Sequence, residues 1–189
     1  MTAQSGPPTA LVLVDVTNSF FLEGMPNYYP EAGIVLPAIR RLIETARASG
    51  RIVVHAVEQH YPGFDDYEWR KLPRHHMIGH ADAAIFAGFE PRGPREILMK
   101  KRRFSAFFAT DLALFLHEQN IERLVIAGVK TNVCLRASAQ DAFANGFDVV
   151  VPREATNSNR PHLAAASLED IDRYMGRVVA LDEAIGMLT

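Results

Sequence analysis

The 189-residue chain has only one cysteine, Cys134, and almost no excess of charge of either sign. A single cysteine excludes a disulfide within the chain and is typical of a protein from a reducing cytoplasm. The formal net charge of −2 does not favour nucleic acid or an anionic membrane as a partner. The sequence also lacks an apolar run long enough to span a bilayer, and its first residues do not have the pattern of a signal peptide. We therefore expect a cytoplasmic protein.

Apolar runs and helical patterns alternate along most of the chain. Residues 1–9 are polar and rich in proline, and they predict a flexible arm before one domain over residues 10–189. Apolar runs without polar alternation predict strands that are buried on both faces. Six such strands are expected over residues 10–14, 51–57, 96–100, 124–127, 147–151 and 177–181, with helices over about 31–49, 110–120, 132–144, 161–175 and 182–188. This order predicts an α/β fold of three α-β-α layers around a mostly parallel, roughly six-stranded sheet.

Three chemically reactive side chains follow predicted strands directly. Asp15 ends the first strand and Lys101 ends the third, while Cys134 lies between the fourth strand and the helix after it. Ligands of parallel α/β sheets bind beyond the C-terminal ends of the strands. The three side chains can therefore meet if their strands are neighbours, although the sequence does not fix the strand order.

These residue types suit nucleophilic attack on a carbonyl group. A thiolate at Cys134 can attack, and Asp15 can take the thiol proton and pass it to a leaving amine. Lys101 can favour the charged forms of both by direct attraction, and backbone N–H groups of the turn at 129–133 can stabilise an oxyanion. Each residue also has a simpler interpretation. Cys134 can be a buried structural thiol, Asp15 can pair at a strand end, and Lys101 can belong to the basic run 100–103 on a solvated face.

Four motifs are similar to those of the isochorismatase-like cysteine hydrolases, a family that includes nicotinamidases, ureidoacrylate and biuret amidohydrolases and N-carbamoylsarcosine amidase. The similarity extends from Leu11 to about Leu188. The motifs are LVLVDVTNSFF, which contains Asp15, KRRFSAFFAT, which contains Lys101, AGVKTNVCLRASAQDAFANGFDVVV, which contains Cys134, and PREAT at 152–156. The resemblance implies the isochorismatase-like fold.

The resemblance also implies a catalytic triad of Asp15, Lys101 and Cys134. It implies a cis peptide bond between Val129 and Lys130, with the backbone N–H groups of Lys130 and Cys134 as the oxyanion hole. Because family members that cleave a vinyl ether lack the cysteine, its presence implies hydrolysis of a C–N bond through a thioester. The expected substrate is a small amide, ureido or carbamoyl compound, and the expected assembly is a homodimer or homotetramer without a cofactor.

Pocket residues are harder to assign. Phe20, Trp69 and Leu72 are candidates to line the substrate pocket, but ordinary core or interface positions suit them about as well. Thr17 stands where many family members have glutamine, so the polar contacts to the substrate are expected to differ there.

Nicotinamidases of this family bind a metal through an Asp-x-His motif and a later histidine. This chain has Glu58-Gln59-His60 at the corresponding place, without a clear later histidine in residues 64–67. The segment LPRHHMIGHADAA resembles a Pro-x-His-Cys-x-x-Gly-Thr region, and we interpret it as lining for the substrate. Its adjacent residues His75 and His76 would point apart on a regular backbone. We therefore expect solvated polar residues here and no metal site.

Two other functions remain open from the sequence. The chain could be a vinyl-ether hydrolase that acts without a covalent step, in which case replacement of Cys134 would spare activity. Alternatively, it could be a binding or redox module that uses Cys134 as a sensing thiol.

Overall fold

The computed structural model describes residues 6–189, so residues 1–5 of the predicted arm lie outside the described residues. The chain is already part of the sheet at Thr9, where the first strand begins. Just before it, the carbonyl of Pro8 accepts hydrogen bonds from the backbone N–H groups of Glu122 and Arg123. Within residues 6–189, none of the helices combines the length and the apolar composition that a bilayer span requires.

The sheet is entirely parallel, with the strand order β3-β2-β1-β4-β5-β7. These strands confirm the six predicted ones, and the additional β6 is a two-residue strand that pairs with β4. The bounds are β1 (Thr9–Val14), β2 (Val53–Glu58), β3 (Glu96–Lys101), β4 (Arg123–Val129), β5 (Asp148–Pro152), β6 (Thr156–Asn157) and β7 (Gly176–Val179).

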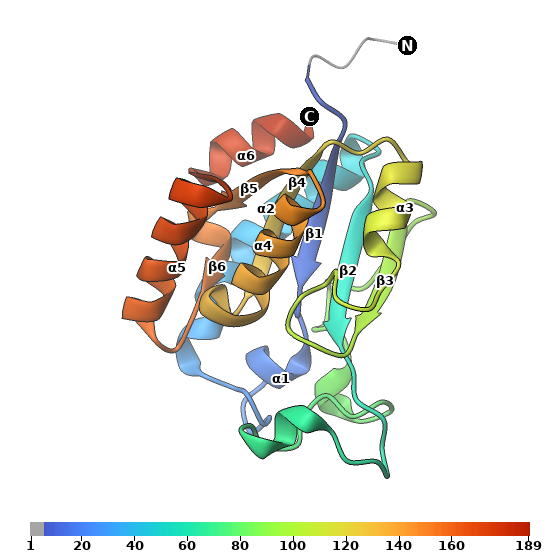
Figure 1. The fold of residues 1–189 in the computed structure, drawn as a ribbon, viewed down its shortest axis with the longest axis vertical. Helices are drawn as coiled ribbons and strands as arrows, with labels where there is room; N and C mark the ends of the chain where they lie inside the picture. The colour runs from blue at the N-terminus through green and yellow to red at the C-terminus, as the bar shows by residue number, and fades with distance from the viewer. Residues whose placement is uncertain (1–5) are drawn as a thin grey trace.

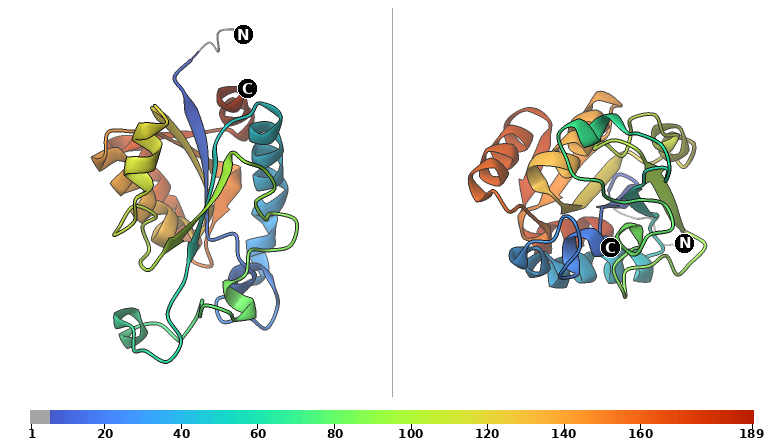
Figure 2. Two further views of the ribbon diagram at one scale, coloured as in Figure 1. Left: turned by 90° about the vertical axis from the view of Figure 1, so that its right-hand side faces the viewer. Right: turned by 90° about the horizontal axis from the view of Figure 1, so that it is seen from below.

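Helices cover both faces of the sheet, as predicted (Figures 1 and 2). Helices α2 and α6 lie on one face, and α3, α4 and α5 lie on the other. The bounds are α1 (Asn18–Phe21), α2 (Leu36–Ala48), α3 (Leu112–Glu118), α4 (Arg136–Ala144), α5 (Pro161–Tyr174) and α6 (Leu181–Leu188), with short 3₁₀ turns at Pro30–Val35, Tyr67–Arg70, Ala81–Ala83 and Arg153–Ala155 and a π-helical turn at Thr131–Leu135.

The first predicted helix begins later than expected. The sequence pattern placed its start near Glu31, but residues Pro30–Val35 form a 3₁₀ turn and α2 begins at Leu36. Pro37 explains the break, because it has no N–H to donate to the preceding turn and is tolerated only in the first turn of an α-helix.

Side chains of β1 alternate between the two cores. Leu11 and Leu13 pack into the core under α2 and α6, while Val12 and Val14 pack into the core under α3, α4 and α5. All four are buried. Two covered faces explain why the strand has a continuous apolar run instead of alternating apolar and polar residues.

Gly128 allows β4 to approach β1 closely at the point where both strands end. It pairs with Val14 and has a φ of 122°, in the left-handed region that favours glycine. A Cβ atom at this position would overlap the carbonyl oxygen of Val14. The contact fixes the end of β1, where Val14 immediately precedes Asp15.

The variant Gly128→Ala tests this contact. We expect a loss of about 2–4 kcal/mol in the free energy of unfolding, because both the steric overlap and the positive φ oppose a side chain. Gly186→Ala is the matched control: it lies in α6 with no heavy atom within 4 Å of the added Cβ. That control should gain about 0.5–1 kcal/mol. Urea unfolding of both variants provides the measurement. Equal free energies of unfolding for the two variants would show that the close contact at Gly128 does not exclude a side chain.

Candidate functional site

The C-terminal ends of β3, β2, β1 and β4 lie side by side and bring the three reactive side chains together. Asp15 follows β1, Lys101 ends β3, and Cys134 lies in the π-helical turn after β4. Because β2 runs between β1 and β3, its last residue, Glu58, also enters the group. Figures 1 and 2 show the segment after β2 extending beyond this edge of the sheet.

A fully buried ion pair forms the centre of the group. Lys101 Nζ lies 2.8 Å from Asp15 Oδ2, and neither side chain is exposed to solvent. Asp15 Oδ1 accepts a hydrogen bond of 2.8 Å from the backbone N–H of Glu58. Lys101 Nζ also lies 3.6 Å from Glu58 Oε2 and donates to the carbonyl of Arg103 at 3.3 Å. One ammonium group thus compensates two buried carboxylates.

The surroundings set the protonation of this pair. Burial lowers the pKa of Lys101, but the negative charges around it, Asp15 first, outweigh burial and raise its pKa above the ordinary value. Lys101 is therefore charged. Burial also raises the pKa of Asp15, with the charge of Lys101 acting in the opposite direction. A carboxylate with a raised pKa is a stronger base than an exposed one.

Cys134 is buried beside both carboxylates. Its Sγ lies 3.9 Å from Glu58 Oε2, and Sγ, an oxygen of Glu58 and an oxygen of Asp15 all lie within 4.8 Å of one another. Burial raises the pKa of the thiol well above its ordinary value; the charge of Lys101 acts in the opposite direction, while those of Asp15 and Glu58 add to the rise. The resting group is therefore a thiol, and it needs a base nearby before it can act as a nucleophile.

The turn before Cys134 has the cis peptide bond between Val129 and Lys130 that the resemblance implies. The carbonyl of Lys130 accepts hydrogen bonds from the backbone N–H groups of Val133 and Leu135. On the other side, the carbonyl of Cys134 accepts a hydrogen bond of 2.7 Å from Ser138 Oγ. These contacts fix both ends of the turn that carries the thiol.

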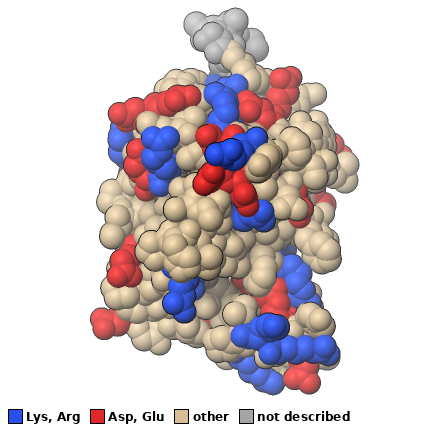
Figure 3. Space-filling view, turned by 60° about the vertical axis from the view of Figure 1, so that its left-hand side comes forward, with Lys and Arg blue, Asp and Glu red and all other residues tan. Residues whose placement is uncertain are grey.

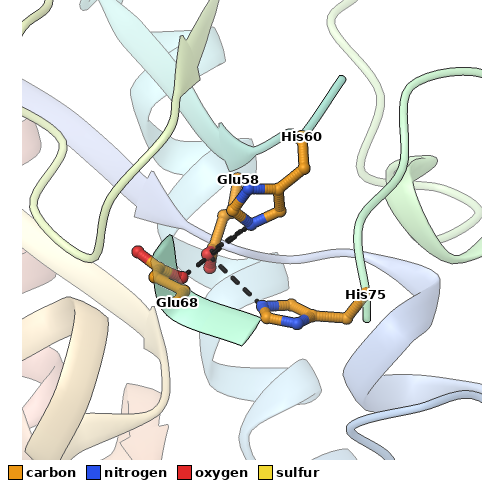
Figure 4. A group of neighbouring side chains, drawn as sticks. All are labelled: Glu58, His60, Glu68 and His75. Carbon is orange, nitrogen blue, oxygen red and sulfur yellow. Dashed lines mark hydrogen bonds and ion pairs between the residues drawn. The ribbon is translucent and has the colours of Figure 1, made fainter. Parts of the chain in front are cut away.

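Four buried side chains form a second group that includes Glu58, as Figure 4 shows. His60 Nε2 lies 3.0 Å and His75 Nε2 lies 3.4 Å from Glu58 Oε1. Glu68 Oε2 lies 3.8 Å from His60 Nε2. One potential ligand atom from each of the four lies within 4.8 Å of the others. The expectation of solvated polar residues is therefore wrong, because all four side chains are buried, His75 among them.

The hydrogen bonds of this group fit a divalent cation. His75 Nδ1 donates to the carbonyl of Pro73 at 2.6 Å, and His60 Nδ1 lies 3.0 Å from Asp66 Oδ2. Both rings thus present Nε2 to Glu58, the arrangement in which a second hydrogen-bond partner orients a metal-ligating histidine. Both oxygens of Glu68 are buried without a hydrogen-bond donor. Two imidazoles and two carboxylates form a donor set that suits zinc.

Glu68 has a strongly perturbed acidity. Burial and the neighbouring charge of Glu58 raise the pKa of Glu68 to about 8. Glu58 behaves in the opposite way: burial raises its pKa, but Lys101 and the hydrogen bonds around it outweigh burial, and its pKa lies well below the ordinary value.

Asp66 ties this irregular segment to the end of β3. Arg102 lies 2.7 Å from Asp66 Oδ2, and Arg103 lies 3.0 Å from Asp66 Oδ1. Figure 3 shows charges of both signs mixed over the upper part of one face and Lys and Arg side chains gathered at its lower edge, at the height of this segment. The carboxylate of Asp66 thus orients His60 and anchors the segment that carries Glu68.

The adjacent histidines do not point apart, because the backbone is irregular at His76, which has a φ of 49°. The His75 and His76 rings are 5.1 Å apart in an edge-to-face arrangement. His76 Nε2 lies 3.0 Å from Thr17 Oγ1, at the position where the sequence departs from the family pattern. Burial lowers the pKa of His76 to about 3, so the ring is neutral.

The three candidate lining residues lie in different surroundings. Phe20 is buried and contacts the His76 ring at 5.4 Å between centroids. The Trp69 ring lies 5.7 Å from the His60 ring, and its Nε1 is buried without a hydrogen-bond partner. Leu72 lines an open surface cavity of about 600 Å³ together with Trp69. Phe20 and Trp69 thus adjoin the histidines of the site, while Leu72 lines surface cavities beside Trp69 and Glu68.

Comparisons with known proteins agree over nearly the whole chain. A family model described as the isochorismatase domain matches residues 9–183. The maleamate amidohydrolase of Pseudomonas putida is 34% identical over 188 residues, which covers 97% of this chain and 88% of that protein. The solved nicotinamidase of Bacillus subtilis has a TM-score of 0.84 and 30% identity, covering 91% of this chain and 98% of that one. The pyrazinamidase of Pyrococcus horikoshii, solved in complex with zinc, has a TM-score of 0.83 and 26% identity, covering 92% and 99%.

The variant Lys101→Met tests the buried ion pair. We expect a loss of about 3–5 kcal/mol in the free energy of unfolding, because two buried carboxylates would lose their cation. Lys100→Met removes the same charge from an exposed neighbour on β3 and should cost less than about 0.5 kcal/mol. Both values come from chemical unfolding, and similar values for the two variants would show that the pair does not stabilise the fold.

Proposed function

The chain belongs to the isochorismatase family, which includes amide-cleaving hydrolases, and we propose that it is a cysteine hydrolase that cleaves a C–N bond of a small amide, ureido or carbamoyl compound. One observation carries this proposal: a buried thiol lies beside a carboxylate that is itself paired with a buried lysine at 2.8 Å. The arrangement provides a nucleophile, a base and a fixed positive charge in one place.

The first half of the proposed reaction forms a thioester. Asp15 takes the proton of Cys134 while Sγ attacks the substrate carbonyl carbon. The resulting oxyanion is held by the backbone N–H groups of Lys130 and Cys134, each worth about 3–4 kcal/mol in comparable sites. Asp15 then gives its proton to the leaving nitrogen, the C–N bond breaks, and ammonia or an amine departs.

The second half restores the enzyme. Water gives a proton to Asp15 and attacks the thioester carbonyl, and the C–S bond breaks as the acid leaves. The sulfur takes the proton back from Asp15, so protons balance over the cycle. Lys101 does not exchange protons in this scheme, because the charges around it keep its pKa high. Its role is to stabilise the anionic forms of its neighbours.

The geometry favours this scheme over the two alternatives. Vinyl-ether hydrolysis without a covalent step has no use for a thiol in contact with two carboxylates. A sensing thiol is typically exposed and has a lowered pKa. Cys134 is only 3% exposed and its pKa is raised.

We also propose that Glu58, His60, Glu68 and His75 hold a divalent cation, with zinc as the favoured ion. The buried donor set supports this, and so do the oxygens of Glu68, which are buried without a hydrogen bond and have ion-pair partners only at 3.8 Å. A relative of the same fold has been solved with zinc. Such a cation, when bound, acts as a Lewis acid toward a water molecule or a substrate oxygen.

Assembly as a homodimer or homotetramer and a cytoplasmic location stay predictions. The segment beyond the sheet edge exposes three large aromatic side chains, which are candidates for an interface: Tyr61, Phe64 and Tyr67, exposed by 51%, 71% and 68%. Exposed aromatic groups of this kind are enriched at protein interfaces.

Ammonia release across a panel of small amides, ureides and carbamoyl compounds tests the proposed reaction. Wild-type protein should turn over at least one compound, and Cys134→Ala should lose at least about 10⁴-fold in kcat/KM, because no nucleophile remains. Mass spectrometry of the wild type during turnover should show an acyl group on Cys134. Equal turnover by the two proteins would instead favour hydrolysis without a covalent step.

Metal binding is tested separately. We expect chelator-treated wild-type protein to bind one zinc ion per chain and to gain about 2.7 kcal/mol of stability when zinc is present at one hundred times its Kd. His75→Gln and Glu68→Gln should lose most of this gain. His80→Gln, at an exposed histidine of the same segment, is the control and should keep it. Zinc content and melting temperature are the readouts, and identical behaviour of His75→Gln and the control would remove the site.

A further inference from the structure

Lys130 places a cation beside the proposed site without a carboxylate to balance it. Its side chain is half-buried, and its Nζ lies 5.8 Å from the centre of the Phe20 ring and 5.4 Å from that of Tyr29. Among residues 6–189 no carboxylate pairs with this ammonium. Contacts with ring faces attract a cation, but each is weaker than a charge-assisted hydrogen bond.

A second cation, Arg160, acts on Lys130. Burial lowers its pKa, and so does the charge of Arg160, while the charge of a Cys134 thiolate acts in the opposite direction. The Arg160 guanidinium, at the start of α5, also has no carboxylate partner in the part of the chain that the structure describes. The two cations thus repel each other, and within residues 6–189 neither has a carboxylate partner. An anionic ligand would relieve both the desolvation and the repulsion.

The walls around Lys130 are fixed. Tyr29 is buried and its hydroxyl donates a hydrogen bond of 2.7 Å to Asn157 Oδ1. Asn157 belongs to β6 and pairs with Val129, the residue before Lys130. Phe20 packs against His76 at 5.4 Å between ring centres. The lysine stem thus lies along an aromatic wall whose position is set by the same strands that hold the thiol.

We propose that Lys130 binds a carboxylate of the substrate, so that the enzyme acts on amides or ureides of short acids and prefers them to neutral amides. This inference rests on the proposed function. In that scheme the backbone N–H of Lys130 holds the scissile carbonyl oxygen, and the side chain starts from the same residue. A four-carbon stem then limits the carboxylate to a few bonds from the scissile carbonyl.

A matched pair of substrates tests the preference. Maleamate and its diamide differ in one charged group, and the wild type should prefer the monoamide. In Lys130→Met, kcat/KM for the monoamide should fall about tenfold to hundredfold more than that for the diamide, mainly through KM, because one charge-assisted contact is lost. Lys130→Arg should recover part of the preference. Lys100→Met removes an exposed lysine and should keep the wild-type ratio.

Alkylation of Cys134 gives a readout that does not depend on turnover. Iodoacetate and iodoacetamide form the same C–S bond and lose the same iodide, but only iodoacetate carries a carboxylate. The ratio of their rates, followed by mass spectrometry, should fall about tenfold in Lys130→Met and stay constant in Lys100→Met. If Lys130→Met slows both reagents and both substrates by one common factor, Lys130 stabilises the Cys134 thiolate and does not bind a carboxylate. The inference is then overturned. Unchanged ratios overturn it as well.

The two proposals fail in different ways. If Cys134→Ala keeps turnover, the covalent mechanism fails. The preference of the enzyme for the charged substrate over the neutral one still tests whether Lys130 binds a carboxylate. If the alkylation ratio depends on Lys130 but no compound of the panel is hydrolysed, the anion site stands and the proposed activity fails.

Discussion

The buried pair of Lys101 and Asp15 is the interaction on which the rest of the site depends. A fully buried ammonium group is costly unless carboxylates surround it. The sheet meets this requirement through its strand order, because β2 runs between the strands that carry the pair and ends in Glu58. Gly128 then lets β4 approach Val14 closely enough to bring the turn with the thiol beside Asp15.

Glu58 connects the two groups of side chains. Its Oε1 faces His60 and His75, and its Oε2 faces Lys101 and Cys134. The negative charge of Glu58 raises the pKa of the thiol. Anything that neutralises this carboxylate, a proton or a cation alike, therefore makes the thiolate easier to form. The state of the buried histidine cluster is thus coupled to the reactivity of Cys134 through one side chain.

The sequence was sufficient to predict the strands and the meeting of Asp15, Lys101 and Cys134, because strand ends in a parallel sheet share one edge. The cluster around Glu58 was not predictable in the same way. Its other members lie in a segment without periodic pattern, where tertiary contacts such as the bridge between His60 and Met77 determine the backbone. One signal was available: Glu58 ends an apolar strand in the same manner as Asp15, and a carboxylate at that edge requires a partner.

Two unlike polar groups contact the Phe20 ring beside the proposed pocket. The first is the neutral ring of His76, which Thr17 contacts and whose buried Nδ1 has no hydrogen-bond partner. The second is the charged Lys130, whose Nζ lies 5.8 Å from the centre of the same ring. A neutral group with a free hydrogen-bonding atom suits an uncharged amide or ureido nitrogen, whereas an unpaired ammonium suits an anion. A substrate with one neutral polar end and one anionic end pairs with both groups. A substrate that is neutral throughout leaves the half-buried ammonium of Lys130, whose burial costs more free energy than that of a neutral ring, without a partner.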